Sequence, residues 1–179
     1  MTSIKVPTRD QVSPASQILF DTLQKRMGKV PNLYAALGYS PYALQSFMDL
    51  DATLSKGVFN AKEREAIALV VSEVNACEYC LAGHTMAAIK RGFTKEDTLE
   101  LRKGEVADPR LNAIIKLAKS ITETKGKATD EALTNFYNAG FDDAAVMELI
   151  GFVVVRIFTN YAYAVSNVPI DFPLAPPEK

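Results

Sequence analysis

The sequence predicts an all-α protein, folded as a single-domain bundle of about eight helices. Residues that start or stop helices recur along the whole chain: Ser, Thr, Asn or Asp at a start, Pro just inside it, and Gly directly after an end. No segment shows the sustained alternation of apolar and polar residues that is typical of a β-strand. A chain of 179 residues can build one well-packed core, so residues 1–179 are predicted to form one domain.

The first three predicted helices are bounded by proline and glycine. Proline at the first helical position and glycine just past the last is the asymmetry expected of helix ends. The expected bounds are Ser13–Gly28, Pro31–Gly38 and Ser40–Gly57.

The remaining helices are marked by polar capping residues. Asn60 with Glu63, and Asn75 with Glu78, have the spacing of a capping box. They predict one helix from Asn60 to about Val74 and another from Asn75 to Gly92, with the core motif in residues 60–92. The later helices are expected at Thr94–Gly104, from Asp108 through Ile121, at Thr129–Gly140 and from Asp142 to about Ser166.

A weak internal sequence similarity suggests a repeated helical unit. Residues 65–80 align without a gap to residues 148–163, and the two segments share a leading Glu and a Val pair. In the second copy Asn160 and Tyr163 stand where the first has cysteines, so a second half-repeat at 141–168 would carry no thiol.

Composition and charge exclude several classes of protein. Apolar residues make up 48% and charged residues 23%, as in an ordinary globular protein. The net charge of −1 gives no electrostatic reason for a nucleic-acid or membrane partner. The N-terminus lacks the apolar run of a signal peptide, and the longest apolar segment, Leu149–Val165, is short for a bilayer span and interrupted by charge. We therefore expect a cytoplasmic protein.

The same apolar segment predicts self-association. Leu149–Val165 is apolar on nearly every face, and Phe47–Val58 is also rich in apolar residues. A single chain of this size covers so much apolar surface with difficulty, so a homo-oligomer is predicted.

The segment from Cys77 to His84 contains both cysteines and the only histidine. Cys77, Cys80 and His84 are spaced i, i+3 and i+7, so one helix would present all three on one face. Cα atoms three residues apart in a helix lie about 5–6 Å apart, which a disulfide can span. In a reducing compartment this pair favours redox or metal chemistry over a structural disulfide.

Glu65 is the expected carboxylate partner of His84. In one continuous helix over residues 61–91, Glu65 would lie about 18 Å along the axis from Cys77. A break at Asn75 instead folds two helices back on each other and brings Glu65 level with His84. The carboxylate then reaches the imidazole directly or through one water.

The pattern of Glu65, eleven residues, Cys77-x-x-Cys80, three residues and His84 resembles the signature of the alkyl hydroperoxidase D-like proteins of the carboxymuconolactone decarboxylase superfamily. The resemblance implies a thiol peroxidase that reduces alkyl hydroperoxides or hydrogen peroxide without a cofactor or metal. It implies that Cys80 attacks the peroxide, that Cys77 resolves the sulfenic acid as a Cys77–Cys80 disulfide, and that His84 and Glu65 relay protons. It further implies a lipoyl protein or thioredoxin-like dithiol as reductant, and a trimer or hexamer. Several members carry a second histidine between the cysteines, where this chain has Tyr79.

The helix start and His84 favour different cysteines as the attacking thiol. With Asn75 as N-cap, Cys77 would be the second helical residue, where free N–H groups and the helix dipole lower a thiol pKa. His84 lies one turn beyond Cys80 and two beyond Cys77, which favours Cys80 as the attacking sulfur.

Other interpretations of the four residues remain open. The cysteines could be small buried hydrophobes, His84 a satisfied core histidine and Glu65 a solvated helix residue. The same residues make a conceivable zinc set, although structural zinc sites usually recruit ligands from two separate segments. Lactone decarboxylation is a further alternative, but decarboxylases of this superfamily generally lack the Cys-x-x-Cys pair. A non-enzymatic thiol sensor or oligomeric adaptor is the last.

Overall fold

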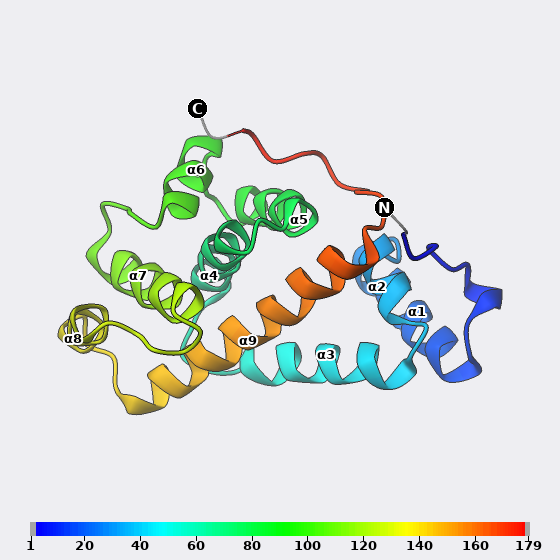
Figure 1. Cartoon of the computed structure of the whole chain (residues 1–179), viewed down its shortest axis with the longest axis horizontal. Coiled ribbons are helices and arrows are strands. Elements are labelled where there is room, and N and C mark those ends of the chain that lie inside the picture. Colours follow the sequence, from blue (N-terminus) through cyan, green and yellow to red (C-terminus); the bar gives the residue numbers. More distant parts are fainter. Residues whose placement is uncertain (1–2, 178–179) are drawn as a thin grey trace.

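The structure is a computed structural model that describes residues 3–177 (Figure 1). In that range it holds nine α-helices, one short 3₁₀ helix (η1) and no β-strand, which confirms the all-α prediction with one helix more than the eight or so expected. The bounds are η1 Arg9–Gln11, α1 Pro14–Met27, α2 Asn32–Leu37, α3 Pro41–Leu54, α4 Ala61–Val74, α5 Glu78–Lys90, α6 Lys95–Lys103, α7 Pro109–Glu123, α8 Asp130–Asn138 and α9 Asp143–Ser166.

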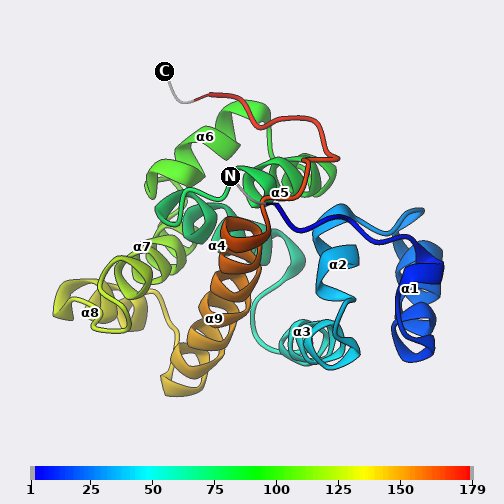
Figure 2. The ribbon, with the colours of Figure 1, turned by 45° about the vertical axis from the view of Figure 1, so that its right-hand side comes forward.

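Helix α9 runs between two groups of helices. Helices α1 to α3 lie on one side of it and α4 to α8 on the other in Figure 1, and Figure 2 again shows α1 to α3 on one side, with α7 and α8 on the other. Helix α4 packs against α5, α6, α7 and α9. Residues on α4 are therefore held from several directions at once.

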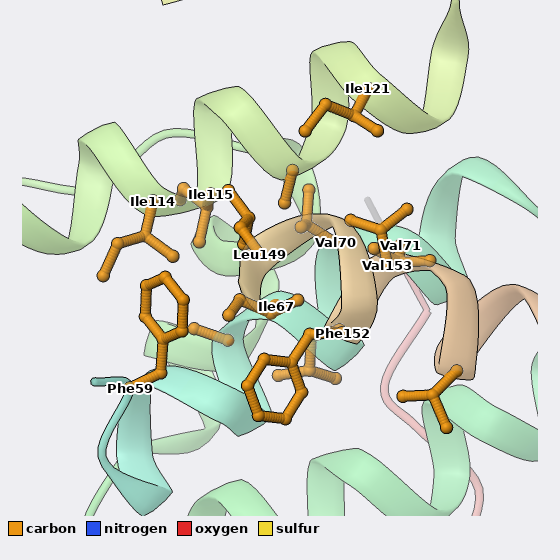
Figure 3. Packing of buried hydrophobic residues seen from close by; sticks show 14 of the residues in the cluster. Phe59, Ile67, Val70, Val71, Ile114, Ile115, Ile121, Leu149, Phe152 and Val153 are labelled. Atoms are coloured by element: carbon orange, nitrogen blue, oxygen red, sulfur yellow. The ribbon is translucent and has the colours of Figure 1, made fainter. Parts of the chain in front are cut away.

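The core fills the space between α4, α7 and α9 (Figure 3). Its side chains come from Phe59 just before α4, from α4 itself, from α7 and from α9, and the labelled Phe59, Ile67, Ile114, Leu149 and Phe152 are all fully buried. Burying a side chain of this size stabilises the fold by about 1.5–3 kcal/mol. The core thus fixes α4 relative to α9, and both helices contribute residues to the candidate site.

Most helices start at the polar residue that the sequence predicts. Each of these side chains accepts a hydrogen bond from a backbone N–H group two or three residues later, which satisfies a donor that the helix leaves free. They are Ser13, Ser40, Asn60, Thr94, Asp108, Thr129 and Asp142.

The predicted start of α5 at Asn75 is wrong. Asn75 ends α4 instead, and Cys77 is the N-cap of α5. Ala76 adopts a left-handed conformation with φ of 50°, its N–H donates to the carbonyl of Glu73, and the N–H of Cys77 donates to that of Ser72. This pair of bonds is a Schellman motif, which closes a helix with a left-handed residue. Alanine occupies the position where glycine is usual, so no residue type marked this helix end.

The two similar segments, residues 65–80 and 148–163, differ in backbone structure. The first breaks at residues 75–77 between α4 and α5, whereas the second lies within the unbroken α9. Helix α9 spans 24 residues and is longer than the apolar segment Leu149–Val165 considered from the sequence. By length and apolar composition it could cross a membrane. Half of its most apolar window is buried inside the fold, as in the core helix of a globular protein.

Candidate active site

The two cysteines form a disulfide at the start of α5. Their Cα atoms are 5.3 Å apart, and the backbone N–H of Cys80 donates to the sulfur of Cys77 at 3.3 Å. Cys77 is 1% exposed and packs in a small cluster with Leu33, Tyr79 and Val168. Cys80 is 5% exposed and lines a cavity of about 500 Å³, whose lining does not include Cys77. A molecule in the cavity therefore meets Cys80 first.

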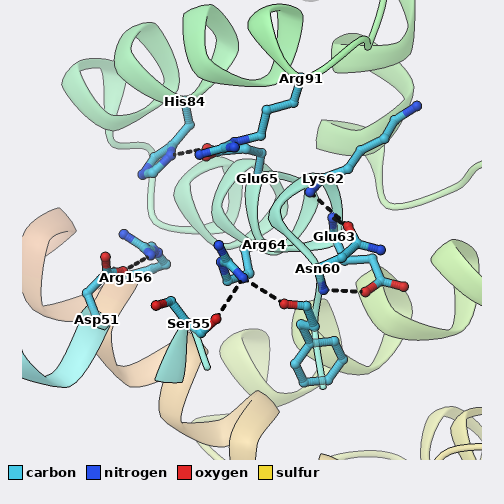
Figure 4. Close-up of polar contacts among 11 residues, drawn as sticks. Asp51, Ser55, Asn60, Lys62, Glu63, Arg64, Glu65, His84, Arg91 and Arg156 are labelled. Atoms are coloured by element: carbon cyan, nitrogen blue, oxygen red, sulfur yellow. Dashed lines mark hydrogen bonds and ion pairs between the residues drawn. The ribbon is translucent and has the colours of Figure 1, made fainter. Parts of the chain in front are cut away.

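His84 and Glu65 are in direct contact, as the sequence predicts (Figure 4). His84 Nδ1 and Glu65 Oε2 are 2.8 Å apart, and both residues line the cavity that Cys80 borders. The other carboxylate oxygen accepts a hydrogen bond from Arg91 Nε at 3.0 Å. The Glu65 side chain is 12% exposed, so it is not a solvated helix residue.

The charge of Glu65 determines which ring nitrogen of His84 carries a proton and which has a free lone pair. Burial alone would raise the pKa of Glu65, but the hydrogen bonds and charges of His84 and Arg91 outweigh it and lower that pKa to about 2. Glu65 is thus a carboxylate at neutral pH and accepts a hydrogen bond from the Nδ1–H of His84, so Nδ1 carries the ring proton in the neutral form of the imidazole. Nε2 is then left with a lone pair, which can accept a proton.

Tyr79 lines the cavity and holds the C-terminal segment. Its hydroxyl donates to Asp171 at 2.5 Å and accepts from the backbone N–H of Leu33 at 3.1 Å. Burial, followed by the bond to Asp171, raises the pKa of Tyr79, so the phenol stays neutral. Phe172 packs edge-on against the Tyr79 ring and lines the cavity. Tyr79, which lies between the two cysteines in the chain, therefore anchors the segment that borders the site.

The structure brings all four predicted site residues to one place and adds others that sequence reasoning missed. Arg91, Arg64 and the Arg156–Asp51 ion pair lie around the same cavity. Arg156 had one usable signal: it interrupts an apolar helix, and a buried charge needs a partner. Among residues 3–177 no group of three or more His, Cys, Asp or Glu side chains is arranged to hold a metal ion.

Fold and site together define an all-α protein with a Cys-x-x-Cys pair at the start of one helix and a histidine–carboxylate pair beside it. The model of the Carboxymuconolactone decarboxylase family matches residues 41–123, which run from the start of α3 to the end of α7 and hold the four predicted site residues. The chain belongs to this family, and its fold is that of alkyl hydroperoxidase D-like proteins.

Three proteins resemble this chain in sequence or in fold. Uncharacterized protein 4 in cox locus of Paracoccus denitrificans is 34% identical over 76 residues, which are 40% of this chain and 68% of that protein. An alkylhydroperoxidase AhpD core protein from Ralstonia eutropha JMP134 superposes with a TM-score of 0.81 at 18% identity, covering 93% of this chain and 91% of that one. The debrominase Bmp8, whose C82A variant was crystallised with 2,3,4-tribromopyrrole, superposes with a TM-score of 0.80 at 16% identity, covering 96% of this chain and 92% of that one.

Proposed function

We propose that this protein is a thiol peroxidase that reduces an organic hydroperoxide or hydrogen peroxide by cycling the Cys77–Cys80 disulfide. One observation carries the proposal: Cys80 lines the same cavity as His84, whose tautomer Glu65 fixes with a free Nε2. A thiol, a base and room for a small molecule are what peroxide reduction by cysteine requires.

The first step oxidises Cys80. In the reduced protein Nε2 of His84 accepts the Cys80 thiol proton, and the thiolate attacks one peroxide oxygen. The S–O bond forms as the O–O bond breaks, and the departing alkoxide or hydroxide takes the proton from His84. The sulfur loses two electrons and becomes a sulfenic acid, while the peroxide gains two and leaves as an alcohol or water.

The second step closes the disulfide. The Cys77 sulfur attacks the Cys80 sulfenic acid, the S–O bond breaks, and hydroxide leaves with a proton as water. In the disulfide form the two Cα atoms are 5.3 Å apart, within the range that a disulfide spans. An external dithiol, of the lipoyl or thioredoxin-like class, then restores both thiols by disulfide exchange. In this proposal the peroxide and the dithiol are the partners, and a reducing cytoplasm is the setting.

The test is peroxide consumption by the reduced protein with dihydrolipoamide or a thioredoxin as donor. We expect turnover by the wild type and none by Cys80→Ser. Cys77→Ser should form a sulfenic acid at Cys80 and stall, which mass spectrometry detects as a 16 Da (about one oxygen) adduct trapped after one equivalent of peroxide. An adduct on Cys77 in the Cys80→Ser protein, with none on Cys80 in the other, would reverse the roles.

A second reaction must be measured beside the first. The fold likeness to a debrominase makes 2,3,4-tribromopyrrole a necessary alternative substrate. If the reduced protein releases bromide from it and consumes no peroxide with any dithiol, the proposed function is wrong. Loss of stoichiometric zinc from both cysteine variants, with no peroxide consumption, would favour the metal-binding alternative.

A further inference from the structure

Arg156 is a buried cation with unused hydrogen-bond donors. It lies on α9, is 7% exposed and lines the cavity that Cys80 borders. One guanidinium nitrogen, Nη2, pairs with Asp51, while the buried Nε has no hydrogen-bond partner. No residue from 3 to 177 accepts a hydrogen bond from its Nη1 either. A guanidinium has five N–H donors, so apart from the buried Nε–H this side chain keeps donors on Nη1 and Nη2 for a molecule in the cavity.

The surroundings of Arg156 favour an anion. Arg64 Nη1 donates to the carbonyls of Ser55 and Phe59, and its guanidinium borders the same cavity (Figure 4). The charged lining residues other than His84 are four arginines and two carboxylates, which leave a formal charge of +2 on a chain whose net charge is −1. They are Arg26, Arg64, Arg91, Arg156, Asp51 and Glu65.

The rest of the lining suits an organic body rather than hydrogen peroxide alone. Leu33, Tyr34, Met86 and Phe172 contribute apolar surface. A cavity of about 500 Å³ has the size of a site for a small organic molecule. Hydrogen peroxide would need neither this apolar surface nor a second cationic group.

We propose that the cavity binds an organic hydroperoxide that carries a carboxylate, with the carboxylate on Arg156 and the peroxide group at Cys80. Arginine and carboxylate match in shape and can form two parallel hydrogen bonds. This assignment of the substrate class rests on the proposed peroxidase function. The anion site itself does not, and it can be tested without turnover.

A purely structural Arg156–Asp51 pair makes a different prediction. If the pair only stabilises the fold, removing either partner harms the protein in the same way. If Asp51 competes with a bound carboxylate for the guanidinium, Asp51→Asn tightens binding of that carboxylate, whereas Arg156→Met weakens it. The two variants therefore move affinity in opposite directions only if the site binds anions.

The first experiment measures binding of 4-isopropylbenzoate, an unreactive carboxylate, to the full chain by calorimetry. Arg156→Met should weaken binding at least tenfold, Asp51→Asn should tighten it, and the neutral 4-isopropylbenzamide should bind at least tenfold more weakly than the acid. Arg110→Met is the matched control, since Arg110 also pairs with a carboxylate but lies outside the cavity lining, and it should leave affinity unchanged. Arg156→Lys, which keeps the charge beside Asp51, replaces the Met variant if that protein does not fold. Equal affinity for acid and amide, or weaker binding by Asp51→Asn, overturns the proposal.

The second experiment compares cumene hydroperoxide with its 4-carboxylate derivative. We expect the wild type to favour the carboxylate at least tenfold in kcat/KM, and Arg156→Met to lose that preference. Peroxide consumption without the preference would refute the substrate class and leave the peroxidase function standing. Carboxylate binding that depends on Arg156, with no peroxide consumption, would refute the peroxidase function and leave the anion site standing.

Discussion

Replacing Glu65 by glutamine should inactivate the site by changing the tautomer of His84. The two carboxylate oxygens of Glu65 accept from His84 Nδ1 at 2.8 Å and from Arg91 Nε at 3.0 Å. An amide has only one oxygen, and arginine can only donate, so the amide oxygen of the introduced glutamine must face Arg91. Its NH₂ group then faces Nδ1 and donates to it. The imidazole proton moves to Nε2, where His84 needs a lone pair to accept the thiol proton.

The expected loss is large in activity and moderate in stability. Proton transfer by a positioned base contributes about 10²–10⁴-fold to a rate, and the corresponding Asp-to-Asn change in a serine protease triad lowers kcat by about four orders of magnitude. We therefore expect kcat/KM for peroxide to fall by roughly 10²–10⁴-fold. A carboxyl whose pKa falls from 4.5 to about 2 on folding contributes roughly 3 kcal/mol to the free energy of unfolding at neutral pH.

The sign of that contribution gives a second observable. Because the folded pKa is the lower one, the stabilisation is complete above pH 4.5 and is lost as the pH falls from 4.5 toward about 2. Urea unfolding of the wild type should therefore become easier across this window, and the Glu65→Gln protein should show a shallower decline.

A direct assay of the tautomer is available because His84 is the only histidine. In protein labelled with ¹⁵N-histidine, one pair of ring signals reports the site: the wild type should be protonated at Nδ1 and Glu65→Gln at Nε2. Adding Arg91→Met to Glu65→Gln frees the amide oxygen to face Nδ1, so this double variant should recover at least about tenfold in kcat/KM over Glu65→Gln alone. Activity of Glu65→Gln within threefold of the wild type (about 0.6 kcal/mol), or an unchanged tautomer, would refute the reasoning.

Three further predictions concern the fold and assembly. Ala76→Gly should raise the free energy of unfolding by about 0.5–1 kcal/mol in urea titrations. Glycine adopts a positive φ without the steric penalty of alanine, and only part of that gain is lost to the larger entropy of the unfolded chain. A lower urea midpoint would contradict this. Tyr79→Phe should lower the free energy of unfolding by about 1–3 kcal/mol in the same titration, because the Leu33 N–H and Asp171 lose their hydroxyl partner. An unchanged free energy of unfolding would show that water replaces the hydroxyl. Static light scattering should give a mass above the 19.6 kDa of one chain, because α9 carries an exposed apolar stripe. The stripe consists of Met147, Ile150, Val154, Phe158, Tyr161 and Val165. A mass equal to one chain would exclude an oligomer.

Local signals explain why so much of this fold could be predicted from the sequence. Helix starts depend on a cap and its neighbours within three residues, so Asn60 or Asp142 identifies a boundary without knowledge of the rest of the chain. The approach of Glu65 to His84 followed from a single break between two helices, and the structure confirms it.

Contacts between distant segments could not be predicted in this way. Arg156 and Asp51 are separated by 105 positions, and Tyr79 and Asp171 by 92. No periodicity or capping rule links such residues, because their proximity depends on how whole helices and the C-terminal segment pack. The sequence could flag Arg156 as an interruption of an apolar helix but could not identify its partner or the cavity it faces.

The start of α5 at Cys77 affects the reactivity of both thiols. As N-cap, Cys77 receives the N–H of Cys80, and free N–H groups at a helix start stabilise a thiolate. Cys77 is nevertheless buried outside the cavity lining, so a peroxide in the cavity does not meet it. Cys80 has the access and, one turn away, the base. In the proposed reaction the two features act in different steps: the helix start favours Cys77 as the thiolate that attacks the sulfenic acid, and His84 favours Cys80 as the thiolate that attacks the peroxide.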